Sequence, residues 1–135
     1  MTDESLAAMP ATEMARAFAN KTLSPKEALV AVLDRLDEVE PSINAFVHVD
    51  RDGAKKAAAA AETRYQNGTP LGPLDGIPLS VKDMLLTKGM PTRKGSLTTD
   101  PDAPQDTDAP AVARARAAGA VLYGKTTTTE FGGSP

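Results

Sequence analysis

The residue with the clearest chemical potential is Lys82, within the segment Gly76-Ile-Pro-Leu-Ser-Val-Lys-Asp83. Alternation along this segment predicts a strand in which Ser80, Lys82 and Met84 share one face. A strand lysine usually directs its ammonium group to water. It can act as a general base only where poor solvation or a nearby cation lowers its pKa from about 10.4. On the residues alone, both interpretations of Lys82 stay open.

A second segment, Gly119 to Thr126, has the letters of a phosphate-binding loop: glycine, four residues, then Gly-Lys-Thr. Such a loop follows a strand and opens a helix, whose N-terminus then faces the phosphate. Here an alanine-rich helix is predicted before Gly119 and a strand after it, so the order is reversed. We therefore interpret Gly119 as a helix C-cap and Gly124 as a turn at the end of a strand, and nucleotide binding as a minor alternative.

Two other groups of residues could be taken for metal ligands or a base. Asp100, Asp102, Asp106 and Asp108 form an acidic stretch, but it lacks the central glycine and the terminal glutamate of a calcium loop. We predict a solvated loop whose aspartates cap the next helix. His48, in a predicted strand, is interpreted as structural.

Composition narrows the class of protein. The chain has 135 residues, no cysteine, one histidine and a net charge of −3. The absence of cysteine excludes disulfides and thiolate chemistry, and the absence of a basic block argues against direct nucleic-acid binding. No apolar run reaches the roughly 18 residues of a membrane span. We expect a cytoplasmic protein with no membrane association.

Local patterns predict an α/β fold. The strongest helix start is Ser24-Pro25-Lys26-Glu27, which has the residues of a capping box with proline at the first helical position. We predict helices at 12–20, 24–40, 52–66 and from about 110 to 118, and strands at 43–49, 77–84 and 120–123. Between the last two strands, 87–106 is predicted to be a long loop. This order favours a sheet with helices packed against it.

With these residues in view, the chain resembles the N-terminal part of the amidase signature family. The Gly-Ile-Pro-Leu-Ser-Val-Lys-Asp core is the most specific piece of this likeness. The other matching pieces, in the same order and spacing, are Gly89-Met-Pro-Thr92 with Gly95-Ser96, Asp108-Ala-Pro110 through Val121, Gly124-Lys-Thr126 and Thr129-Glu-Phe131.

The resemblance implies a fold, an activity and a role for one residue. The fold would be a mixed β-sheet flanked by helices, of which residues 1–135 form an N-terminal fragment: a helical arm at 1–23 and helix and strand units at 24–135. The activity would be hydrolysis or transfer of a carboxamide by a Ser-cis-Ser-Lys triad, with Lys82 as the catalytic lysine. No metal or organic cofactor is implied.

The resemblance also implies that both triad serines lie in a glycine-rich segment that follows these residues. Gly132-Gly133-Ser134 superficially resembles that segment, but Ser134 is too close to Phe131 to be taken as the nucleophile. We therefore expect the chain alone to be inactive, and to act with the rest of an amidase chain or a complementing chain on a small amide substrate. A homo-oligomer is possible, and a non-catalytic binding subunit is the main alternative.

Overall fold

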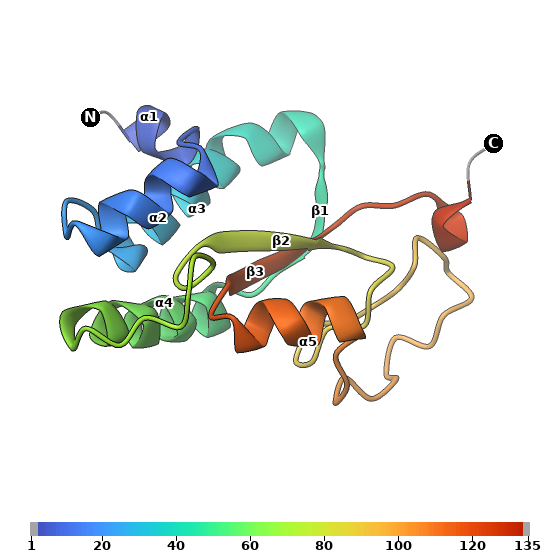
Figure 1. Ribbon diagram of the computed structural model, residues 1–135. Helices are drawn as coiled ribbons and strands as arrows, with labels where there is room; N and C mark the ends of the chain where they lie inside the picture. Colours follow the sequence, from blue (N-terminus) through green and yellow to red (C-terminus); the bar gives the residue numbers. More distant parts are fainter. Residues whose placement is uncertain (1–2, 134–135) are drawn as a thin grey trace.

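The computed structural model describes residues 3–133. It contains the predicted helices and strands in the predicted order, together with two short helices, at Asp3–Ala7 and Glu130–Gly132, that were not predicted. Figure 1 shows the strands running through the middle, with α2 and α3 above them and α4 and α5 below. The elements are α1 (Asp3–Ala7), α2 (Ala11–Ala19), α3 (Pro25–Ile43), β1 (Phe46–Val49), α4 (Arg51–Gln66), β2 (Pro78–Lys82), α5 (Pro110–Ala117), β3 (Val121–Thr126) and the 3-10 turn η1 (Glu130–Gly132).

The three strands form one mixed sheet in the order β1-β3-β2. The last strand of the described chain, β3, lies in the centre, antiparallel to β1 and parallel to β2. Pro78 opens β2, as expected for a residue without an amide proton. The predicted helix-flanked mixed sheet is therefore confirmed. Among the described helices, none combines the length and apolar character needed to cross a membrane.

Helix α3 begins as predicted and ends later. The Ser24 side chain accepts a hydrogen bond from the Glu27 amide, and the Glu27 carboxylate accepts one from the Ser24 amide. The predicted stop at Pro41 is wrong, because the helix continues to Ile43. Proline cannot donate a backbone hydrogen bond here, but the last turn still closes through the Asn44 amide, which donates to the Glu40 carbonyl at 2.8 Å.

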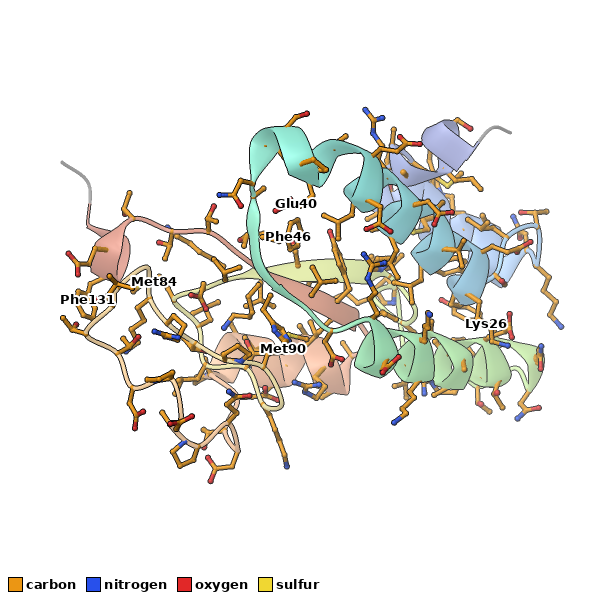
Figure 2. The ribbon with its side chains drawn as sticks, turned by 180° about the vertical axis from the view of Figure 1, so that it is seen from behind. Lys26, Glu40, Phe46, Met84, Met90 and Phe131 are labelled. Atoms are coloured by element: carbon orange, nitrogen blue, oxygen red, sulfur yellow. The ribbon has the colours of Figure 1, made fainter. Side chains whose placement is uncertain are left out.

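The connection from α3 to β1 explains why β1 is shorter than predicted. Asn44 adopts a left-handed conformation, with φ of 47°. The carboxylate of Glu40 then accepts hydrogen bonds from the Ala45 and Phe46 amides, at 3.1 and 2.9 Å. Figure 2 shows Glu40 above Phe46 at this bend. The strand can begin only at Phe46, after the bend is complete.

The core between α3 and α4 is built from leucine against alanine. Leu29, Leu33 and Leu36 of α3 pack on Ala54 and Ala58 of α4, which are fully buried. Small side chains on α4 let the two helices approach closely, and Val121 of β3 joins the same cluster. This contact places α4 against the central strand, as the alanine-rich segment in the sequence requires.

A second core fixes the start of β2. Met14 and Phe18 of α2 pack with Ile77, which comes directly before β2, and Tyr65 of α4 lies edge-on to the Phe18 ring. Next to this cluster, the carboxylate of Asp75 is fully buried and accepts two hydrogen bonds from Arg64, at 2.9 and 2.5 Å. The end of α4 is therefore tied to the turn that leads into β2.

Helix α5 has a different cap from the predicted one. Its N-cap is Ala109, which makes no side-chain capping bond. Asp108 instead accepts two hydrogen bonds from Arg116, at 2.7 and 3.0 Å, and one from the Lys88 amide at 2.6 Å. The predicted capping role of this aspartate is wrong because Arg116, in the last turn of α5, provides a stronger, bidentate partner. Asp108 thus fastens both ends of the long loop to α5.

The Asp108 contact gives a pH-dependent prediction. The hydrogen bonds from Arg116 lower the pKa of Asp108 below its ordinary value. The carboxylate therefore adds stability above about pH 4, its ordinary pKa, and this contribution is lost as the pH falls through the lowered pKa. Because Arg116 is partly exposed, we expect D108N to lower the free energy of unfolding by only about 1 kcal/mol at pH 7.

Denaturant unfolding of the protein and of D108N at pH 7 and at pH 3 measures this contribution. The difference between the two proteins should shrink at the lower pH. A difference that stays constant or grows as the pH falls would show that Asp108 does not act through its charge.

Candidate functional site

Lys82 is the last residue of β2, and its backbone is held on both sides. After it, the Asp83 amide continues the ladder by donating to the Thr126 carbonyl at 2.9 Å. The Lys82 carbonyl accepts hydrogen bonds from the Met84 and Leu85 amides, at 2.7 and 3.1 Å. The chain therefore turns sharply here, and the predicted strand that included Met84 ends two residues earlier.

The side chain of Lys82 lies on the face of β2 opposite Val81 and Asp83. Those two side chains are buried, whereas Lys82 is exposed and Ser80, on the same face, is half-buried. Burial raises the pKa of Tyr123, and an interaction with Ser80 opposes that shift. The predicted face of Ser80 and Lys82 is thus seen, but residues 3–133 do not provide the desolvation that a lysine base requires.

The opposite face holds a buried ion pair that the sequence analysis did not identify. The ammonium group of Lys125 and the carboxylate of Asp83 are 3.2 Å apart, and the two residues are 0% and 1% exposed. Lys125 also donates to the Thr92 hydroxyl at 2.7 Å and to the Pro91 carbonyl at 3.1 Å. Burial lowers the pKa of Lys125, and the neighbouring Asp83 opposes that shift.

An extra residue in β3 decides which face Lys125 occupies. Leu79 pairs with Leu122, but the next residue, Ser80, pairs with Gly124, so Tyr123 has no partner on β2. After this bulge Lys125 is opposite Val81 and shares its face. Without the extra residue, regular alternation would place Lys125 on the face of Lys82 instead.

Gly124 lies inside β3, at the bulge, so its predicted place in a turn at the strand end is wrong. A Cβ atom at this position would lie 2.7 Å from the His48 carbonyl oxygen and 3.0 Å from the Phe46 ring. Strand β1 therefore passes β3 at a distance that only glycine permits.

The loop after β2 folds back around Asp83. The carboxylate of Asp83 accepts hydrogen bonds from the Arg93 amide at 3.2 and 3.3 Å, and its carbonyl accepts one from the Lys94 amide at 3.0 Å. These contacts close the segment from 83 to 94 into a compact unit at the end of β2. Asp83 is therefore fixed through its amide, its carbonyl and its side chain.

The segment after β3 docks on the same unit. The Phe131 amide donates to the Lys94 carbonyl at 2.8 Å, and the buried Ser96 hydroxyl donates to Glu130 at 2.7 Å. Figure 2 shows Met84 and Phe131 close together at this end of the molecule. Lys82, two residues before Met84, therefore lies near the end of the described chain.

The other residues that the sequence suggested for a functional site are not shown to lie near Lys82. The C-cap of α5 is Ala118 and not Gly119, which comes next and has the left-handed φ of +88° that ends a helix. Strand β3 follows it, so the reversed context of the phosphate-loop letters is confirmed. His48 is half-buried in β1. Asp100 accepts a hydrogen bond from the Asp102 amide, and residues 3–133 contain no cluster of three potential metal ligands. Ser134 lies outside the described residues.

Comparison with known proteins assigns the chain to a family. The amidase family profile matches residues 27–135. This chain belongs to the amidase family. A glutamyl-tRNA(Gln) amidotransferase subunit of Salinispora arenicola is 45% identical over 97% of the chain, and an acylamidase of Rhodococcus erythropolis is 40% identical over 98%. The X-ray structure of a peptide amidase from Stenotrophomonas maltophilia superposes with a TM-score of 0.83 at 31% identity over 91% of the chain.

The chain spans about a quarter of the length of these amidase relatives: 26% of the Salinispora protein, 28% of the acylamidase and 25% of the peptide amidase. The expected resemblance to amidase signature enzymes is therefore confirmed for this portion.

The sequence signals that could have revealed the Lys125 and Asp83 pair were weak. Asp83 follows Val81 at strand spacing, and Lys125 follows the apolar residues of the next strand, but nothing local links the two.

The bulge gives a testable prediction for the amidase fold. We expect G124A to lower the free energy of unfolding by about 2 kcal/mol, because the new methyl group must push β1 away from β3. G133A is the matched control, since a Cβ atom there would have its nearest neighbour, the Glu130 carbonyl oxygen, at 3.4 Å. Equilibrium unfolding of both variants measures the effect, and equal stability of G124A and G133A would contradict it.

Proposed function

We propose that this chain is the lysine-bearing portion of an amidase that hydrolyses or transfers a carboxamide, and that Lys82 is its general base. One observation carries the proposal. The family's specific segment places Lys82 at the end of β2 with its backbone fixed by the sheet and by a tight turn, while its side chain is exposed. A rigid backbone with an accessible amine is what a positioned base requires.

In the proposed mechanism Lys82, in its neutral form, takes a proton from a middle serine held in a cis peptide. That serine takes the proton of a second serine, which attacks the amide carbonyl carbon to form an acyl-enzyme and release the amine. Water or another amine then resolves the acyl-enzyme. Backbone amides beside the nucleophile would stabilise the oxyanion.

The described residues leave Lys82 exposed, so we propose that its desolvation comes from the part of the enzyme that carries the serines. In this proposal residues 1–135 are the N-terminal portion of one amidase domain, with a helical arm at 1–23 and the sheet units at 24–135. The packing of Phe18 on Ile77 supports an arm that is integral to the fold. The serines would come from a continuing chain or from a complementing one.

The substrate class is a small carboxamide, and the relatives support two reaction types. One relative is named as part of an amidotransferase and another as an acylamidase, at similar identity. We therefore propose amide bond chemistry without choosing between hydrolysis and transfer. An assay that supplies an aryl acylamide alone, and then with an added acceptor amine, distinguishes them by the products. We also propose a cytoplasmic location.

The intact mass of the protein purified from its source, with sequencing of its C-terminal peptide, tests the domain proposal. A longer chain with two serines in a glycine-rich segment supports it. A chain of 135 residues without a complementing subunit in the same preparation would contradict it, since one lysine alone cannot form the triad.

The base assignment predicts a large loss of activity with little loss of stability. In the active enzyme we expect K82M to lower kcat by roughly 1000-fold or more, because the serine loses its proton acceptor. The thermal midpoint should stay within about 2 °C, because the side chain is exposed. K56M makes the same substitution at an exposed lysine of α4 and should keep full activity. An active K82M would contradict the assignment.

A further inference from the structure

Lys125 is a fully buried cation that the proposed chemistry does not use. Its ammonium group donates hydrogen bonds to the Thr92 hydroxyl at 2.7 Å and to the Pro91 carbonyl at 3.1 Å, and it forms an ion pair with the Asp83 carboxylate at 3.2 Å. A group so completely bonded cannot accept a proton from a substrate or a serine. Its role must therefore be sought in what these three contacts hold in place.

The ion pair between Lys125 and Asp83 restricts the position of Lys82. Asp83 is the next residue in the chain, and the ion pair fixes its side chain while its amide bonds the Thr126 carbonyl. Asp83 therefore cannot rotate or shift along β3 without breaking the buried pair. The position of the Lys82 Cα atom, one residue earlier, is fixed with it.

The hydrogen bond from Lys125 to Thr92 also connects Lys125 to Lys82, through Leu85. The Thr92 hydroxyl, which accepts from Lys125, donates to the Leu85 carbonyl at 3.3 Å. The amide of Leu85 in turn donates to the Lys82 carbonyl at 3.1 Å. The same ammonium group is therefore linked to Lys82 along two routes, one on each side of the turn that follows β2.

The small net stability expected of a buried ion pair suggests that this pair holds its neighbours in place. Replacing a buried ion pair with apolar side chains of similar size is often neutral or stabilising, because burying two charges costs much of what their attraction returns. An apolar side chain at position 125 could fill the same space. It could not make the two hydrogen bonds and the ion pair that hold the segment next to Lys82.

We propose that Lys125 is a positioning residue: through Asp83 and Thr92 it sets the place and direction of the Lys82 side chain on the opposite face of β2. The inference rests on the proposed function, since it assigns Lys82 as the base. The bulge at Tyr123 is part of this device, because it sends Lys125 away from the Lys82 face.

The main test is the double variant D83N/K125M in the active enzyme. It leaves no buried charge unpaired, and the asparagine side chain can still accept from the Arg93 amide, so the fold should persist. We expect kcat to fall by roughly 30-fold or more while KM stays within about threefold, because small misplacement of a catalytic group slows chemistry more than binding. If the pair only neutralises charge, the folded double variant will have the wild-type kcat.

The second variant, T92V, keeps the ion pair and removes only the Thr92 route. Valine has nearly the shape of threonine but cannot bond Lys125 or Leu85. We expect kcat to fall by about fivefold at unchanged KM, with a thermal midpoint close to that of the wild type. K56M serves as the control for the lysine to methionine change, and K82M gives the activity floor.

The outcomes separate this inference from the proposed function. If the wild-type enzyme is active and K82M is not, the base assignment stands. Wild-type kcat in folded D83N/K125M, or in T92V, would then overturn the positioning role. If the double variant does not fold, T92V alone decides. If K82M is as active as the wild type, the proposed function itself fails.

Discussion

The parallel pairing of β2 with β3 is the contact on which the candidate site depends. It brings Lys82 beside Thr126 and Val81 beside Lys125, although the long loop and α5 separate the partners in the chain. The alternation of each strand then sends Lys82 to one face and the Asp83 and Lys125 pair to the other. A one-residue slip in this register would exchange the two faces. Because Tyr123 is an extra residue, Leu79 can pair with Leu122 while Val81 still pairs with Lys125.

Local sequence predicted the helices well, because their determinants are local. The Ser24 capping box and the Asn67-Gly68 end of α4 lie within a few residues of the features they control. The errors came from distant partners. Asp108 is adjacent to a helix start, but Arg116, in the last turn of that helix, binds its carboxylate. Glycine is typical of turns, but Gly124 lies within a strand, where β1 passes too close for any larger residue.

The same distinction holds for the site. The position and face of Lys82 could be predicted from a strand pattern and a family likeness. The buried pair could not, since Asp83, Thr92 and Lys125 come from three separate segments and each is unremarkable by itself. Their grouping depends on the register of β2 and β3 and on the return of the loop after β2. Likewise, the exposure of Lys82 depends on which elements pack on β2, and the alternation of residues along the strand does not predict that.

The central place of β3 also governs how the chain can fold. Both β1 and β2 are synthesised before their common partner exists, and helices α1 to α4, which also precede β3 in the chain, can form first. At a synthesis rate of about 5–20 residues per second, β2 waits roughly 2–9 seconds after Lys82 is made before Thr126 appears. During that interval the strand that carries the candidate base has unpaired backbone groups on both sides within the described sheet. Completion of β3 is therefore the event that converts two unpaired strands into a sheet.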